Sequence, residues 1–257
     1  MYSKKYAVVI VAKEISDNIL EYYSSGEISY DLFLVSPDYS TSLKDKYKTI
    51  IFRKDSEFFD RDSYEVIEKT DRPNWYYQQF LKYCVVINLH KEFYYDFVHI
   101  VDGDSFLRKE ILLEEKIYYT PKTIEKQYQN FIDRTELKLK DDKNFISNQM
   151  CFNPMYLNEM LTNIARDKDW VDYFLEIIVK NDSCWLSEYQ LYACYVKYKH
   201  SIEEEELKVF RRLDLINVSV EKSLEKYTVV ANEVQHNAGL LRTLRANLYF
   251  AFGKNLG

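Results

Sequence analysis

Two aspartates separated by one glycine, Asp102-Gly103-Asp104, follow an apolar run at residues 97–101. Side chains alternate along a strand with period two, so we expect both carboxylates on the same side of the strand end. Gly103 would let another group approach the backbone closely. Two hard oxygen donors at this spacing suit Mg²⁺ or Mn²⁺, especially when diphosphate oxygens complete the coordination shell. Such a metal neutralises charge on a departing nucleoside diphosphate.

The same three residues have a second interpretation, because Asp-Gly is the commonest signal for a two-residue hairpin turn. Against a hairpin, residues 97–101 do not alternate between apolar and polar side chains as a solvated hairpin arm should. On this motif alone, metal binding and a plain turn both remain open.

A second group of polar side chains lies upstream, in a segment predicted to be helical from Asn74, as its cap, to about residue 91. Trp75 and Gln79 are four residues apart, as are Gln78 and Lys82, so their side chains can converge near the strand end. A lysine near a diphosphate and an amide near a sugar hydroxyl are reasonable roles. The alternative is an amphipathic helix with an aromatic core face and a solvated polar face.

The elements that position these residues alternate between strand and helix. Apolar runs predict strands at residues 6–12, 30–36, 49–53 and 97–101, and helices at 16–24 and 74–91. This alternation predicts an α/β fold with a mostly parallel mixed sheet flanked by helices. Ligands of such sheets bind beyond the carboxyl ends of the strands, which directs attention to Ser36-Pro37-Asp38 and to the residues after Val101.

The second half of the chain is less regular. It predicts a strand at 145–153, helices at 154–166, 170–179 and 185–200, a late strand at 227–231 and a final helix at 240–252. The charge run at 203–206 is expected to be a solvated helix end. Because no linker rich in Gly, Pro or Ser interrupts the chain, we expect a single Rossmann-like domain over residues 1–237.

Composition limits the partners and the compartment. With 35 basic and 41 acidic residues the chain is mildly acidic, so we expect no nucleic-acid partner. No stretch is long and apolar enough to span a bilayer, and the amino-terminal apolar run is predicted to be a core strand rather than a signal peptide. The four cysteines lack CxxC spacing, which favours buried free thiols in a reducing cytosol.

Three segments together resemble a known family. The Trp-x-x-Gln-Gln-x-x-Lys helix at residues 75–82, the Asp-x-Asp strand end and Ser187-Glu188-Tyr189 resemble, in order, the bacterial GT-A glycosyltransferases of capsule and lipopolysaccharide clusters. The resemblance covers residues 5 to 240. It implies a GT-A fold with Mn²⁺ or Mg²⁺ held by Asp102 and Asp104. It also implies transfer of a hexose-like sugar from a nucleotide-sugar, with UDP as the favoured carrier, to a saccharide or lipid-linked acceptor in surface polysaccharide synthesis.

The resemblance also assigns roles around the donor. Donor binding is expected from Trp75, Gln78, Gln79, Lys82, Asp102, Asn148 and Gln149, the last two in a stretch where the family often carries a polar loop. Many GT-A enzymes bring a histidine from near the carboxyl end as an extra metal ligand, and His236 has the corresponding place.

Glu188 has three interpretations. In an inverting enzyme it would be the general base that takes the proton of the acceptor hydroxyl. In a retaining enzyme it would hold a hydroxyl of the donor sugar. Alternatively, Glu188 and Ser187 merely cap a helix. The sequence leaves all three open.

Residues 238–257 form a predicted amphipathic helix. Its leucines recur near helical spacing, and Arg242, Arg245 and Lys254 are accompanied by no acidic residue. Such a helix either rests on the inner face of an anionic plasma membrane or packs on the domain of a cytoplasmic protein.

Two other classes of protein compete with a transferase. A haloacid-dehalogenase-like phosphatase also carries Asp-x-Asp after a buried strand, with the first aspartate as nucleophile. That motif normally follows the first strand of its domain, whereas three predicted strands precede Asp102. A catalytically inactive GT-A-fold binding protein would leave the aspartate pair unused, and the coexistence of Lys82, Asp102, Asp104 and Glu188 argues against it.

Overall fold

The computed structural model describes residues 4–26, 29–59, 65–135, 137, 139–181, 183–212 and 219–232. In this part, the central sheet has the strand order β3-β2-β1-β4-β8. These strands are β1 (Tyr6–Val11), β2 (Asp31–Ser36), β3 (Ile50–Lys54), β4 (Phe97–Asp102) and β8 (Gln149–Phe152). The first four are parallel and β8 pairs antiparallel with β4. The mostly parallel mixed sheet predicted from the sequence is confirmed.

Both faces of this sheet are covered. Ala7, Val9 and Val11 of β1 belong to one hydrophobic core, whereas Val8 and Ile10 belong to another. Successive side chains of a strand point to opposite faces, so a strand between two cores is apolar at every position. This explains why the strand runs are continuous rather than alternating.

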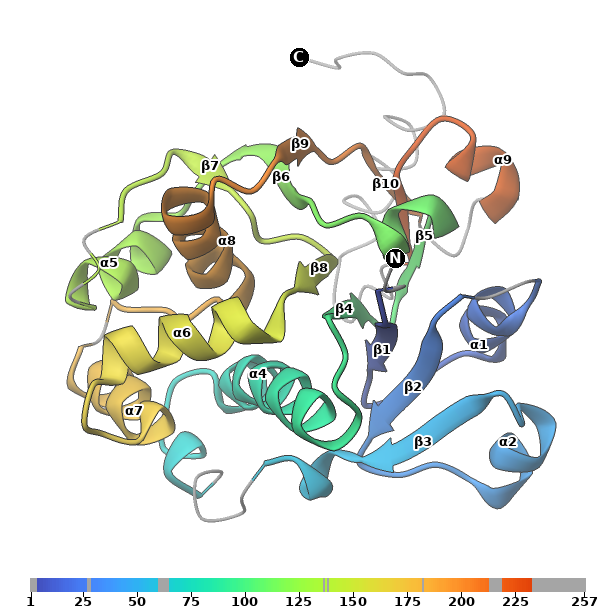
Figure 1. The fold of residues 1–257 in the computed structure, drawn as a ribbon, viewed down its shortest axis with the longest axis horizontal. Helices are drawn as coiled ribbons and strands as arrows, with labels where there is room; N and C mark the ends of the chain where they lie inside the picture. Colours follow the sequence, from blue (N-terminus) through green and yellow to red (C-terminus); the bar gives the residue numbers. More distant parts are fainter. Residues whose placement is uncertain are drawn as a thin grey trace, which may run out of the picture.

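Helices supply the other side of each core. Their bounds are α1 (Asp17–Ser24), α2 (Thr41–Lys46), α4 (Pro73–Phe93), α5 (Lys126–Arg134), α6 (Pro154–Ala165), α7 (Trp170–Lys180), α8 (Glu188–His200) and α9 (Val220–Leu224). Figure 1 shows α4, α6, α7 and α8 on one side of β1 and β2, and α1 and α2 on the other. The mixed α/β fold flanked by helices therefore follows from two apolar sheet faces, each covered by its own helices.

Two short sheets extend the domain. One has the order β10-β11-β5 and the other β7-β6-β9. Their strands are β5 (Ser105–Leu107), β6 (Ile117–Thr123), β7 (Lys143–Asn144), β9 (Glu204–Glu206), β10 (Val209–Arg212) and β11 (Val229–Asn232). The late strand predicted at 227–231 is confirmed as β11, which pairs antiparallel with β5 directly after the aspartate pair.

The charge run at 203–206 is not a helix end as predicted. Glu204–Glu206 forms β9, parallel to β6. Lysines pair with two of its carboxylates: Lys143 and Lys197 both pair with Glu204, and Lys116 pairs with Glu205 at 3.1 Å. Ion pairs from three separate segments therefore allow consecutive glutamates to form a strand.

The strand predicted at 145–153 is only half correct, because the ladder covers Gln149–Phe152 alone. The Asn144 side chain accepts a hydrogen bond from the Ile146 N–H at 2.9 Å, and the Ser147 hydroxyl donates to the Gln149 carbonyl at 2.6 Å. These local bonds take the place of the strand pairing that was expected.

Two helix starts also differ from the prediction. Arg72, not Asn74, is the cap of α4, because Pro73 has a ring already set for the first helical position and no N–H to satisfy. The helix predicted at 185–200 is α8, which begins at Glu188 rather than at residue 185. There the Ser187 hydroxyl accepts the N–H of Gln190 at 3.3 Å, so the capping interpretation of this segment is confirmed for Ser187.

The remaining predictions concern the cysteines, membrane-spanning segments and the carboxyl-terminal residues. The four cysteines are free thiols, and all except Cys84 are buried. Among the described helices, none is long and apolar enough to cross a membrane. His236, the boundary at residue 237 and the helix predicted within 238–257 lie outside the described residues.

A buried polar pair joins β4 to β8. His99 and Gln149 are both fully buried, and the His99 Nε2 lies 2.5 Å from the Gln149 Oε1. Burial lowers the pKa of His99 to about 4, because a charged imidazole would lose its hydration inside the sheet. His99 therefore stays neutral in the folded chain at pH values where the unfolded chain protonates it.

We expect the free energy of unfolding to fall as the pH decreases from about 6.5 to about 4. Across this window the unfolded state binds a proton at His99 and the folded state does not, so acid favours unfolding. The cost from this residue is about 3 kcal/mol, because its pKa falls from 6.5 to about 4 and each tenfold change in proton affinity is worth about 1.36 kcal/mol. Urea unfolding at a series of pH values measures it. His99→Gln should flatten the slope in this window, and an unchanged slope would contradict the assignment.

Candidate active site

Asp102 ends β4 and is held from three directions. Its N–H donates to the Asn148 carbonyl at 2.9 Å. Its Oδ1 accepts from the Lys82 Nζ at 2.8 Å and from the Tyr189 hydroxyl at 3.2 Å. Both side-chain contacts go to one oxygen, so Oδ2 carries no hydrogen bond from the described residues. The carboxylate is therefore fixed in place while keeping coordination capacity.

Lys82 lies between two carboxylates. Its ammonium is 2.8 Å from Asp102 Oδ1, 2.8 Å from Glu188 Oε1 and 4.3 Å from the centre of the Tyr189 ring. Burial alone would lower the pKa of Lys82, but the charges of Asp102 and Glu188 outweigh it and raise this pKa well above its usual range. Lys82 is therefore a permanent cation, and it joins α4 and α8 to the end of β4.

Glu188 lies on the inner side of this cluster. Its side chain is 2% exposed, whereas that of Asp102 is 33% exposed. Burial raises the pKa of the Glu188 carboxyl, and the charge of Lys82 opposes that rise. A ligand that approaches from solvent meets Asp102 first.

Asp104 is the second carboxylate of the pair. Its Oδ1 accepts from the Ser105 hydroxyl at 2.8 Å. Burial, followed by the negative charge of Asp102, raises the pKa of Asp104 above its ordinary value. Within the described residues, no group of three or more His, Cys, Asp or Glu side chains is arranged to hold a metal. The pair offers two hard oxygen ligands, which suits Mg²⁺ or Mn²⁺ when phosphate oxygens complete the shell.

Gly103 is required by a close approach. A Cβ built on Gly103 would lie 2.3 Å from the Ala12 Cβ and 3.3 Å from its Cα. Ala12 directly follows β1, whose last residue, Val11, is in register with Asp102. The glycine therefore lets the turn that carries both aspartates pack against the end of β1.

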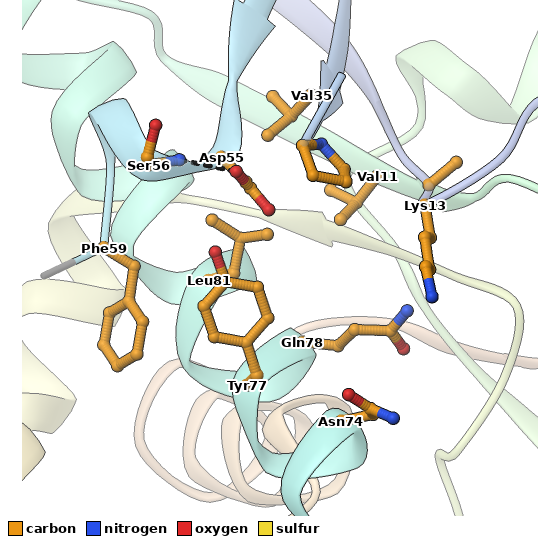
Figure 2. A pocket seen from close by; sticks show the side chains of 12 residues that line it. Val11, Lys13, Val35, Asp55, Ser56, Phe59, Asn74, Tyr77, Gln78 and Leu81 are labelled. Carbon is orange, nitrogen blue, oxygen red and sulfur yellow. Dashed lines mark hydrogen bonds between the residues drawn. The ribbon is translucent and has the colours of Figure 1, made fainter. Parts of the chain in front are cut away.

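Ala12 also lines a pocket of about 490 Å³. Figure 2 shows this pocket from close by. Its lining comes from the ends of β1, β2 and β3 and from the first turns of α4: Val11, Ala12, Lys13, Val35, Pro37, Asp55, Ser56, Phe59, Asn74, Tyr77, Gln78 and Leu81. Its size is that of a small-molecule site, and it lies at the carboxyl ends of parallel strands, where ligands of such sheets bind. Ala12 joins this pocket to the aspartate pair.

Asp55 is a pocket residue that the sequence analysis did not identify. It follows β3 and is 9% exposed. Its Oδ1 accepts the N–H of Ser56 at 2.7 Å, and Figure 2 shows its carboxylate directed into the pocket. Its position after a predicted strand was a usable signal, because the carboxyl ends of neighbouring parallel strands share one edge of the sheet. Tyr189 contacts both Lys82 and Asp102, but the sequence motif that contains it predicted no role for it.

The residues of the α4 motif divide between two places. Gln78 lines the pocket together with Asn74. Gln79 is buried, and its Oε1 accepts the N–H of Glu188 at 3.4 Å. Trp75 donates its indole N–H to the Leu186 carbonyl at 3.0 Å. Gln78 therefore faces the pocket, while Trp75 and Gln79 attach α4 to the segment that leads into α8.

Asn148 and Gln149 lie in different surroundings. The Asn148 backbone contacts Asp102, and its side chain is partly exposed. Gln149 is fully buried against His99, which places its amide inside the sheet rather than beside the aspartate pair.

No family model and no curated protein matches this sequence. Among solved structures, the chain is similar to the galactosyltransferase LgtC, determined in complex with donor and acceptor sugar analogues. The TM-score is 0.42 at 11% sequence identity, with 88% of this chain and 86% of that chain covered.

We expect Gly103→Ala to displace the aspartate turn, because the new methyl overlaps the Ala12 side chain. Overpacking of this kind costs roughly 1–3 kcal/mol of unfolding free energy. Urea unfolding measures the loss. The matched control is Ala12→Gly combined with Gly103→Ala, which removes the clashing methyl and should restore much of the stability. A double variant no more stable than Gly103→Ala would contradict the close approach as the cause.

Proposed function

We propose that this chain is a metal-dependent glycosyltransferase of the GT-A type, which moves a sugar from a nucleotide-sugar donor to a saccharide or lipid-linked acceptor. The observation that carries the proposal is the adjacency of Asp102 and Asp104 to the pocket at the carboxyl ends of β1, β2 and β3, across Ala12. A nucleotide-sugar needs both parts: a concave site for the nucleoside and a place for its diphosphate.

The pocket suits a nucleoside. Its walls offer the apolar surfaces of Val11, Phe59 and Leu81, and polar groups reach into it from Asp55 and Gln78. A carboxylate can accept hydrogen bonds but has none to donate, so Asp55 favours a ligand with N–H or O–H groups, such as a base or a ribose. UDP is the carrier we propose, by resemblance of the motifs.

The aspartate pair suits the diphosphate with its metal. When bound, Mn²⁺ or Mg²⁺ neutralises charge on the leaving nucleoside diphosphate. Asp102 and Asp104 would hold the ion, Lys82 and Tyr189 orient Asp102, and Gly103 lets the turn lie against the pocket wall. We also propose Gln78 and Asn148 as donor ligands, because Gln78 lines the pocket and Asn148 lies beside Asp102.

The test is a thermal-shift screen with UDP-, GDP-, TDP- and CMP-sugars, each with and without Mn²⁺. A donor at one hundred times its dissociation constant adds about 2.7 kcal/mol of stability, or roughly 5–10 °C in Tm for a chain of this length. Asp102→Asn and Asp104→Asn should lose at least about tenfold in affinity for Mn²⁺ with UDP, because each loses a charged oxygen ligand.

The matched control is Asp45→Asn, on the exposed surface of α2, which should bind as the unaltered chain does. Absence of a Mn²⁺-dependent shift with every nucleotide-sugar would overturn the proposal. Phosphate release from a simple phosphomonoester would instead identify a phosphatase, and donor binding without turnover would identify a binding protein.

His236 is proposed as a third metal ligand, on the resemblance alone. His236→Ala should raise the Mn²⁺ concentration needed for half-maximal turnover, since an imidazole is a good ligand for Mn²⁺. His200→Ala, at the carboxyl end of α8, is the control. An unchanged Mn²⁺ titration would remove His236 from the site.

A further inference from the structure

Glu188 is fixed to α4 through its backbone as well as its side chain. Its N–H donates to Gln79 Oε1 at 3.4 Å, and its carbonyl accepts from the Tyr83 hydroxyl at 2.7 Å. Both partners lie on α4, next to Lys82, which pairs with the Glu188 carboxylate. The first turn of α8 is therefore held against the middle of α4.

This position separates Glu188 from any substrate that enters from solvent. The residue is 1% exposed, and its carboxylate meets the Lys82 ammonium. Asp102 contacts the same ammonium and is the more exposed of the two carboxylates. A general base, or a ligand of a sugar hydroxyl, must reach within hydrogen-bond distance of the substrate. Here Lys82 and Asp102 occupy the intervening positions.

The charges explain why a second carboxylate is present. Without Glu188, the charge of Lys82, 2.8 Å from Asp102, would cancel the negative charge of this proposed metal ligand and leave no net attraction for a divalent cation. Glu188 supplies the opposite charge on the buried side and holds the lysine in one position. Lys82 can then orient Asp102 through a hydrogen bond while the cluster of Lys82, Asp102 and Glu188 keeps a net charge of −1.

We propose that Glu188 is a positioning residue, a buried counter-charge that holds Lys82 and through it orients Asp102 toward the metal, and that it contacts neither the acceptor nor the donor sugar. The inference rests on the proposed function, because it takes Asp102 as a metal ligand. Glu188 is then neither the general base nor the ligand of a donor hydroxyl that the sequence left open.

The main experiment uses Glu188→Gln, which keeps the shape and removes the charge. Three quantities are measured: Mn²⁺ affinity by electron paramagnetic resonance, affinity for UDP and for the best nucleotide-sugar of the thermal-shift screen at saturating Mn²⁺, and kcat at saturating Mn²⁺. We expect Mn²⁺ binding to weaken about tenfold or more, because a negative charge beside the site is lost. UDP and the nucleotide-sugar should weaken equally, and kcat should fall less than about tenfold.

The alternatives predict different patterns. A general base gives a fall in kcat of about a hundredfold or more with Mn²⁺ affinity unchanged. A sugar ligand gives a loss in affinity for the nucleotide-sugar but not for UDP. Either pattern overturns the inference. Glu188→Asp keeps the charge and should bind Mn²⁺ more tightly than Glu188→Gln. Glu176→Gln, which breaks only exposed ion pairs with Lys168 and Lys180, is the matched control and should change none of these values.

A stability measurement tests the pairing independently of activity. Lys82→Met should lower Tm strongly, because two carboxylates then face each other without a cation. Adding Glu188→Gln to Lys82→Met should recover part of that loss. A double variant whose Tm falls by the sum of the two single changes would show that Glu188 is not the counter-charge of Lys82.

Asp102→Asn and Glu188→Gln together separate the metal site from the positioning role. If Asp102→Asn binds Mn²⁺ and UDP as tightly as the unaltered chain, the proposed function fails and the inference fails with it. If Asp102→Asn loses binding while Glu188→Gln does not, the function stands and the positioning role is wrong.

Discussion

The buried ammonium of Lys82 is the interaction on which the proposed site depends. It links α4 to the end of β4 and to the start of α8, three elements far apart in the chain. Removing one partner from a buried ion pair costs roughly 3–5 kcal/mol, because the remaining charge is left without hydration or compensation. The cluster therefore constrains the relative positions of these elements strongly, and the side chain of Tyr189 closes it by contacting both Lys82 and Asp102.

A second constraint comes from the place of β1 in the sheet. It pairs with β2 on one side and with β4 on the other, so its carboxyl end borders the ends of both. The residue after it, Ala12, meets the pocket and also the Gly103 turn. The pocket and the aspartate pair are therefore adjacent because they share one strand end, and the absence of a side chain at Gly103 makes the contact possible.

The sequence predictions failed where local side chains or distant ion pairs competed with periodicity. Phe145 and Ile146 are typical strand residues, yet Asn144 and Ser147 bind the backbone there and leave an irregular segment. The glutamates at 204–206 have no strand-like composition, yet lysines from elsewhere in the chain pair with Glu204 and Glu205 in β9. Local bonds between side chains and the backbone leave only a weak signal in the sequence pattern. Ion pairs with distant residues leave none.

The sequence by itself determined the alternation of buried strands and helices and the placement of Asp102 and Asp104 at a strand end. Both depend on residues close together in the chain, where periodicity of side chains is decisive. The tertiary structure alone decided what surrounds the pair. Tyr189 reaches Asp102 across 87 residues of sequence, Glu188 meets Lys82 deep in the interior, and Asp55 enters the pocket from the end of β3. Charge compensation between buried groups is a property of distance in space, and no spacing along the chain specifies it.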